Sequence, residues 1–105
     1  MSAEIQFASG ALDDLDSIWG FIANDSPRAA ERVVTKIVSS CQLLARFPLM
    51  GRQRPELTNA DVRFWPVPRY PNYLVVYRSD ASPLLVLAVL HGKLNLKSAL
   101  LGRDI

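Results

Sequence analysis

Three extended hydrophobic runs between residues 62 and 91 dominate the pattern of the chain. The first run, 62–67, mixes aromatic residues with a proline, and the second, 72–78, is rich in the β-branched and aromatic types that suit a pleated sheet. The third run, 84–91, is apolar until its last residue, which is typical of a strand covered on both faces or placed centrally. Short turns rich in Pro, Asn, Ser and Asp join the runs, so the pattern predicts an antiparallel meander rather than a parallel sheet.

Two amphipathic helices are predicted ahead of the meander. Ser9 is a suitable N-cap for the first helix, whose apolar stripe recurs at steps of three and four residues. This stripe consists of Ala11, Leu15, Ile18 and Ile22, with Leu12 and Trp19 beside it. Pro27 fits the first position of the second helix, where its missing N–H costs nothing, and the helix is expected to stop at Phe47 because Pro48 follows. Its buried line consists of Ala30, Val34, Ile37, Cys41 and Leu44.

The order of these elements predicts the fold class. The short link between the helices requires an antiparallel hairpin, and this hairpin is the only predicted cover for the apolar sheet. Weak alternation over 3–7 predicts a short first strand, and leucines after Gly92 predict a short C-terminal helical tail. We therefore expect an α+β fold, a single domain over residues 1–105, in which a short N-terminal strand and an antiparallel α-hairpin pack on the β-meander in the order β-α-α-β-β-β.

Composition excludes several classes of protein and site. A single cysteine and a single histidine cannot form an internal disulfide or a zinc site, so we expect no metal and no cofactor. Cys41 lies on the buried line of the second helix and is expected to be a small core residue. No apolar run approaches the roughly 20 residues of a membrane helix, and no signal peptide is visible. A cytoplasmic location without membrane association is therefore expected.

Charge is distributed unevenly along the chain, although the net charge is only +2. All 12 bases lie after residue 24, whereas the first 24 residues carry four acids and no base. Three of these acids, Asp13, Asp14 and Asp16, are expected to complement the N-terminus of the first helix. The basic remainder of the chain indicates a surface that attracts an anionic partner.

Three motifs carry a resemblance to a known family. The loop after the second helix reads FPLMGRQRPEL at 47–57, the second strand of the meander contains YLVVYR at 73–78, and the third ends in VLHG at 89–92. In this order, with the two helices ahead of them, the chain resembles the RelE/ParE superfamily of toxins from type II toxin–antitoxin systems, and within it the ParE branch. The resemblance implies a toxin, associated with plasmid stabilisation, that inhibits growth by gripping DNA gyrase without turnover and is neutralised by a ParD-like antitoxin.

Arginines and aromatic residues are the candidate contact sites of such a toxin. Arginines in loops or beside aromatic side chains suit the binding of a large target. The target-binding candidates are Arg52, Arg54, Arg63, Arg69, Arg78 and Lys93. The antitoxin-binding candidates are Trp19, Arg32, Trp65 and Tyr70, although Trp19 is expected in the core rather than at an interface. Trp65 followed by Pro66 also points to an edge strand or a bulge.

The RelE branch implies an alternative function, ribosome-dependent cleavage of messenger RNA. Such cleavage needs a base, an acid and cations around the phosphate, and the weak candidates for these roles are Arg78, His91 and Glu56. RelE-type enzymes usually carry a Tyr or His in the tail, but residues 93–105 contain neither, so an enzyme is the less favoured prediction. His91 is expected instead to bond the backbone at its strand end, and Arg78 to pair with an acid such as Glu56. A general nucleic-acid-binding module is a third reading, and no direct sequence-specific nucleic-acid binding is expected because the net charge is small.

Overall fold

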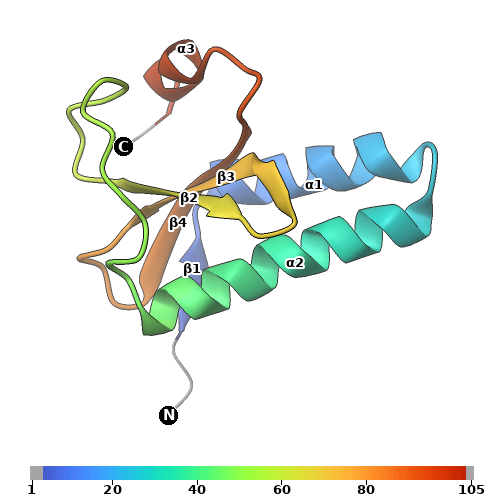
Figure 1. Ribbon diagram of the computed structural model, residues 1–105, viewed down its shortest axis with the longest axis horizontal. Helices are drawn as coiled ribbons and strands as arrows, with labels where there is room; N and C mark the ends of the chain where they lie inside the picture. Colours follow the sequence, from blue (N-terminus) through green and yellow to red (C-terminus); the bar gives the residue numbers. More distant parts are fainter. Residues whose placement is uncertain (1–3, 104–105) are drawn as a thin grey trace.

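The elements occur in the order that the hydrophobic pattern predicts. The computed structural model describes residues 4–103 and contains a four-stranded sheet, a long helical hairpin and a short C-terminal helix (Figure 1). The strands are β1 (Ile5–Phe7), β2 (Arg63–Val67), β3 (Tyr70–Arg78) and β4 (Leu84–His91), and the helices are α1 (Ser9–Ala23), α2 (Pro27–Arg46) and α3 (Leu96–Leu101). The α+β class and the β-α-α-β-β-β order with a helical tail are confirmed. Residue 3, which the predicted first strand includes, lies outside the described residues.

The sheet has the strand order β1-β4-β3-β2. Strands β2, β3 and β4 form the predicted antiparallel meander, with Trp65 opposite Val75 and Val75 opposite Val89. Strand β1 runs parallel to β4, and the α-hairpin together with β2 and β3 lies between these two strands along the chain. The apolar run 84–91 is therefore an interior strand covered on both faces, as its sequence predicts.

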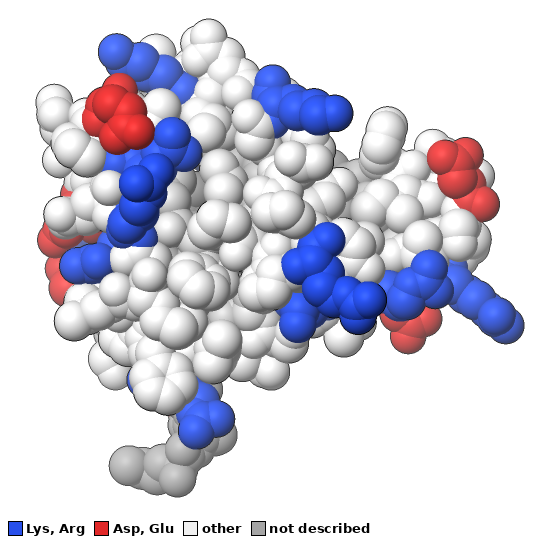
Figure 2. Space-filling model, viewed as in Figure 1, with Lys and Arg blue, Asp and Glu red and all other residues white. Residues whose placement is uncertain are grey.

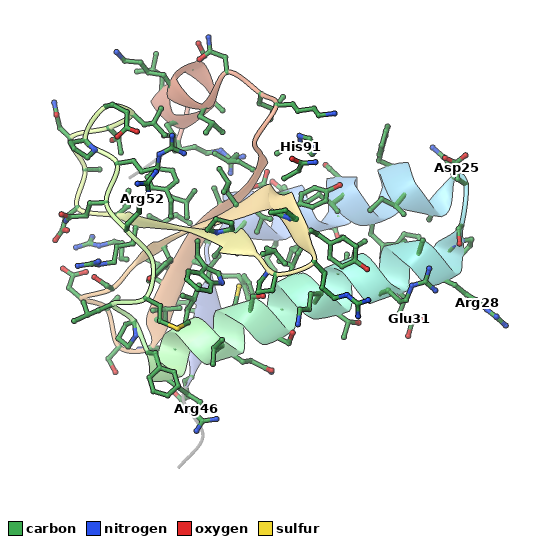
Figure 3. All side chains as sticks on the ribbon, in the orientation of Figure 1. Asp25, Arg28, Glu31, Arg46, Arg52 and His91 are labelled. Atoms are coloured by element: carbon green, nitrogen blue, oxygen red, sulfur yellow. The ribbon has the colours of Figure 1, made fainter. Side chains whose placement is uncertain are left out.

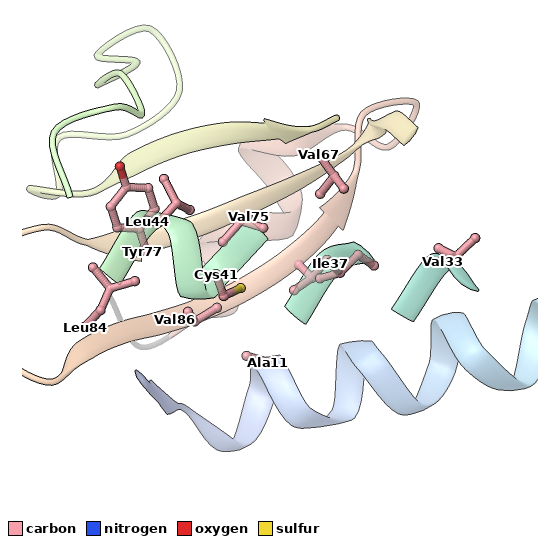
Figure 4. Packing of buried hydrophobic residues seen from close by; sticks show 11 residues of the cluster. Ala11, Val33, Ile37, Cys41, Leu44, Val67, Val75, Tyr77, Leu84 and Val86 are labelled. Carbon is pink, nitrogen blue, oxygen red and sulfur yellow. The ribbon is translucent and has the colours of Figure 1, made fainter. Parts of the chain in front are cut away.

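Side chains from the hairpin and one face of the sheet form the main hydrophobic core (Figure 4). Ile37, Cys41 and Leu44 of α2 are fully buried in it, and each large aliphatic side chain there contributes roughly 1.5–3 kcal/mol through burial. The other buried members are Ala11, Val33, Val67, Val75, Tyr77, Leu84, Val86 and Val89. The buried line predicted for the second helix is thus the face that α2 turns toward the sheet, except that Val33 is buried there and Val34 is not.

The opposite face of the sheet is also buried, which corrects the expectation that the hairpin is the only cover. Residues of the loop between α2 and β2, together with α3, enclose a second core on this side. Its buried members are Val62, Phe64, Val76, Leu87, Ala88, Leu90 and Leu100. Leu87 has no partner on β3, and this irregularity in β4 places Leu87 and Ala88, which are consecutive, on the same side. A strand that is apolar throughout cannot reveal which segments cover it.

The two long helices begin differently. Ser26 caps α2, since its Oγ accepts a backbone N–H three residues on at 3.2 Å, and Pro27 occupies the first helical position as predicted. The prediction of Ser9 as the N-cap of α1 is wrong, because the cap is Ala8, which makes no side-chain bond. Ala8 still donates its N–H to Val86 of β4 while its carbonyl accepts from the first helical turn. The chain therefore passes directly from strand to helix, and Ser9 is already helical.

Asp14 connects three elements and does not complement the N-terminus of its own helix. Its Oδ2 accepts the backbone N–H of Val89 in β4 at 2.9 Å, and its Oδ1 accepts from Nη2 of Arg103 at 2.6 Å. The side chains of Asp14 and Arg103 are only 16% and 23% exposed. No acidic residue lies in the first turn of α1, so the expectation for Asp14 and its two acidic neighbours is wrong. The chain segment after α3 is thereby tied to α1 and β4.

Both edges of the sheet are partly blocked against pairing with a further strand. Phe64 of β2 exchanges two backbone hydrogen bonds with Arg52 of the preceding loop, and the next outward position is Pro66, which has no N–H. On the other side, β1 pairs with β4 over only three residues, and beyond it Asp14 accepts the N–H of Val89. The register of β2 shifts after Pro66, so the predicted edge strand and bulge are both confirmed.

Cys41 is expected to react only when the protein unfolds. Burial in the main core raises the pKa of its thiol to about 12, so the reactive thiolate is almost absent at pH 8. We expect the folded protein to react with a disulfide reagent at least about a hundredfold more slowly than the urea-unfolded protein. Absorbance of the released thiol checks this directly, because the chain has one cysteine. Equal rates in the two states would show that Cys41 is accessible.

Candidate functional site

The basic loop that follows α2 is anchored to the sheet through one tyrosine. Tyr77 of β3 is fully buried, and its hydroxyl donates to Pro48 O at 2.7 Å and accepts the N–H of Gly51 at 2.9 Å. Burial raises the pKa of Tyr77, so the hydroxyl keeps its proton and can donate at neutral pH. Arg63 holds the same turn from the side, donating from Nη1 to Gly51 O at 2.7 Å. The backbone that leads into Arg52 is therefore fixed from two directions.

The arginines near this loop differ in how far their side chains are already engaged in bonds within the protein. Arg54 donates to Glu56 at 3.1 Å and lies 5.9 Å from the ring centroid of Phe64. Arg63 uses its guanidinium on the loop backbone and on a serine hydroxyl, so it is a positioning residue rather than an open contact. Only the backbone of Arg52 bonds the sheet, and its side chain is exposed on the loop (Figure 3). Of the three predicted target contacts here, Arg52 is the most available.

Arg78 pairs with an acid, as predicted, but the acid is Asp80 and not Glu56, which was named as an example. Arg78 donates from Nε and Nη2 to the two carboxylate oxygens of Asp80 at 3.2 and 3.1 Å. This bidentate bond raises the pKa of Arg78 and lowers that of Asp80. A hydrogen bond to its own backbone, and then its contact with Arg54, lower the pKa of Glu56, which makes this exposed carboxylate a weaker base than usual. Both pairs are local surface interactions.

His91 bonds the backbone at its strand end, as predicted. Its Nδ1 accepts the N–H of Lys93 at 3.1 Å, and the ring of Tyr73 meets it edge-on with centroids 5.1 Å apart. These two rings lie opposite each other at one end of the β3–β4 ladder, whereas Arg78 lies at the other end. Six residues of β4 separate the two pairing positions, or about 20 Å at the rise of a strand. The catalytic candidates Arg78 and His91 therefore do not converge on one bond.

The residues predicted to contact a target do not form one surface. Arg69 lies in the turn after β2, and about 13 Å of strand already separates Arg63 from the last residue of β2 before that turn. Lys93 follows the end of β4, beside His91. Figure 2 shows the same separation, with basic side chains gathered in patches over different parts of this face. The loop arginines and Arg69 therefore belong to different patches.

A groove of about 570 Å³ runs between α2 and the β2–β3 turn. Its charged lining residues are Arg28, Glu31, Arg32, Lys36 and Arg69, with Tyr70 beside them. Arg32 and Tyr70, both predicted to bind an antitoxin, thus share one groove with Arg69, which was predicted to bind the target. Arg28 and Lys36 are absent from the sequence candidates, although their spacing of four residues on either side of Arg32 places all three on one helix face.

The two tryptophans predicted as antitoxin contacts differ in exposure. Trp19 is 45% exposed on α1, so the expectation that it lies in the core is wrong. Phe21 and Leu12 are exposed on the same helix. Trp65 packs against the main core, and its indole N–H is buried without a partner among the described residues. Trp19 therefore remains available for contact, whereas Trp65 is mainly a core residue.

The described part of the chain offers few groups for a metal ion. Within residues 4–103, no three His, Cys, Asp or Glu side chains lie close enough together to hold one. In the same range, no helix has both the length and the apolar character needed to span a bilayer. The candidate contacts described above are arginine-rich surfaces on a folded scaffold.

Known proteins are similar to this chain in sequence and in fold. A family model described as the ParE toxin of the type II toxin–antitoxin system parDE matches residues 5–96. The protein Y4kP of Sinorhizobium fredii (strain NBRC 101917 / NGR234) is 31% identical over 87 residues, which cover 83% of this chain and 85% of Y4kP. A solved structure of the chromosomal ParDE TA system from P. aeruginosa has the same fold, with a TM-score of 0.68, 21% identity, and coverage of 86% of this chain and 96% of that one. Because the family model spans most of the chain, the protein belongs to the ParE toxins of type II toxin–antitoxin systems.

Proposed function

We propose that this ParE toxin stops bacterial growth by binding DNA gyrase in the cytoplasm without turnover, and that a ParD-like antitoxin neutralises it. Membership of the family supports the toxin class. The observation that carries the choice between binding and catalysis is the separation of Arg78 from His91 by about 20 Å of strand. Cleavage of RNA needs the cation that stabilises the phosphorane and the group that carries the proton within reach of one phosphodiester, and here these roles would fall to Arg78 and His91. This geometry disfavours the alternative, cleavage of messenger RNA in the manner of RelE.

The loop at 48–61 is the proposed contact with the target. Its first turn is held by the hydroxyl of Tyr77 and the guanidinium of Arg63, so little conformational entropy is lost when a partner binds. Arg52 and Arg54 follow immediately, on backbone that these bonds fix. Arginine is enriched among interface residues that dominate binding energy. The site is therefore a preorganised pair of cations for an acidic or phosphate-bearing surface.

Purified protein is expected to inhibit the supercoiling of relaxed plasmid DNA by gyrase. Replacing both loop arginines (R52Q/R54Q) should raise the half-inhibitory concentration at least about tenfold, because two interface arginines together contribute more than 1.4 kcal/mol when they act as hot spots. R46Q is the matched control, since Arg46 is an exposed cation in the last turn of α2 and lies outside the loop at 48–61 (Figure 3). Its inhibition curve should overlay that of the unmodified protein.

Two results would reject this proposal. Full gyrase activity at a tenfold excess of folded protein would remove gyrase as the target. Primer extension on messenger RNA from expressing cells, if it maps cleavage to translated codons, would replace the binding account with the nuclease account.

The antitoxin is proposed to lay an amphipathic segment over the α-hairpin. Trp19 and Phe21 are exposed on α1 and supply apolar contact, while Arg32 and Tyr70 line the groove along α2. We expect the toxin to co-purify with the product of a short neighbouring reading frame when the two are expressed together. Recovery of the toxin alone from such cells would contradict this part of the proposal.

A further inference from the structure

The groove between α2 and the β2–β3 turn holds cations that the described protein does not neutralise. Arg28, Arg32 and Lys36 recur every fourth residue, so successive cations stand about 6 Å apart along one face of α2. Arg69 faces them from the turn. None of these four takes part in an ion pair among residues 4–103. Figure 2 shows basic side chains gathered along this helix, and Figure 3 shows Arg28 and Glu31 projecting from it.

Arg69 occupies a backbone conformation that suits glycine better. Its φ is 73°, in the left-handed region, and it follows Pro68 in a two-residue turn between the paired Val67 and Tyr70. Glycine adopts this position of such a turn without a steric penalty, whereas arginine is strained there. Backbone strain of this kind clusters at functional sites. The turn therefore places the guanidinium of Arg69 at the groove although its backbone is strained.

The lining favours a protein segment over a nucleic acid. A phosphate backbone brings negative charge to every position, and Glu31, which lies among the cations of α2, would repel it. A polypeptide can place carboxylates opposite the cations and a neutral or basic residue opposite Glu31. Tyr70 is half-buried in the same groove and offers a ring on which an apolar side chain can pack.

We propose that this groove receives an acidic segment of the antitoxin whose carboxylates repeat about every 6 Å opposite Arg28, Arg32 and Lys36. A further carboxylate pairs with Arg69, and an apolar residue packs on Tyr70. The identity of the partner rests on the proposed function, whereas the required chemistry comes from the groove itself. Removal of the groove charges should release the toxin from its inhibitor while leaving the loop at 48–61 intact.

The test uses the full-length toxin and a fluorescent helical peptide of about 20 residues, with Glu at every fourth position of one face and Leu beside it. Anisotropy should show binding that weakens as salt rises from about 50 to 200 mM. The variant R28Q/R32Q/K36Q should bind at least about tenfold more weakly, because three charge contacts are lost. R69G should also bind more weakly yet melt at a higher temperature, since glycine relieves the turn. R46Q should bind like the unmodified protein, and a peptide with Gln for Glu should not bind.

The outcomes separate this inference from the proposed function. Equal binding of the acidic peptide by the triple variant, or tighter binding of single-stranded DNA of equal charge, would overturn the inference. Gyrase inhibition is measured on the same preparations, and the triple variant should retain it. If the peptide binds the groove but gyrase is never inhibited, the acidic-segment inference stands and the proposed target falls.

Discussion

Replacement of Asp14 by alanine will lower the free energy of unfolding by about 2–3 kcal/mol, a large share of the 5–15 kcal/mol typical of a domain. The carboxylate accepts bonds from the Val89 backbone and the Arg103 guanidinium, and both side chains of the ion pair are mostly buried. Alanine leaves a backbone N–H and a shielded cation without partners. The midpoint of thermal unfolding should fall by about 10–20 °C, as followed by circular dichroism.

Two further variants identify the cause of this loss. D14N keeps an acceptor for Val89 but removes the charge opposite Arg103, so it should cost about half as much. D16A is the surface control, because Asp16 is exposed on the same helix and makes no side-chain hydrogen bond or ion pair within residues 4–103. A D14A protein as stable as D16A would show that the three-way connection carries no stability.

Replacement of Gly51 by alanine should both destabilise the protein and weaken its inhibition of gyrase. A methyl group there would stand 2.6 Å from the hydroxyl of Tyr77 and 3.0 Å from the carbonyl oxygen of Phe64. The buried ring of Tyr77 cannot yield freely, so the loop must move outward and lose its two bonds to the hydroxyl. We expect a loss of about 2–4 kcal/mol and, at temperatures where the variant stays folded, a half-inhibitory concentration at least about tenfold higher.

G20A is the matched control for the glycine substitution. Gly20 lies inside α1, and nothing stands within 4 Å of a methyl group placed there. Alanine should therefore stabilise the helix by up to about 1 kcal/mol and leave gyrase inhibition unchanged. If G51A inhibits gyrase as well as G20A does, the fixed loop is not the contact with the target.

The hydrophobic periodicity of the sequence predicted most of the fold, because the helical hairpin and the sheet are regular structures. The apolar stripe of the second helix and Pro27 at its first position are local signals, and both hold in the structure. The second core was not predictable in this way. Val62 and Leu100 come from a loop and a six-residue helix, where too few residues recur to define a face. Parallel pairing of β1 with β4 likewise depends on long-range packing that no short window records.

The candidate site was only partly predictable, because sequence does not show how a side chain is used. Arg52 and Arg63 look alike in the sequence, yet Arg63 holds the loop and Arg52 is exposed. Tyr77 reads as one more aromatic residue of a strand, and only its contact with Gly51 gives it an anchoring role. The grouping of Arg28 with Arg32 and Lys36 was predictable, because residues four apart lie on one face once a helix is predicted there.

The closed sheet edges bear on what happens when the toxin is free of its inhibitor. Exposed strand edges let copies of a protein stack into fibrils, which would remove it from solution. Here the outer edge of β2 is occupied by Arg52 and interrupted by Pro66, while a carboxylate covers β4 beyond the short β1. Liberated molecules should therefore stay dispersed and able to diffuse, so that the dose reaching the target follows the amount released.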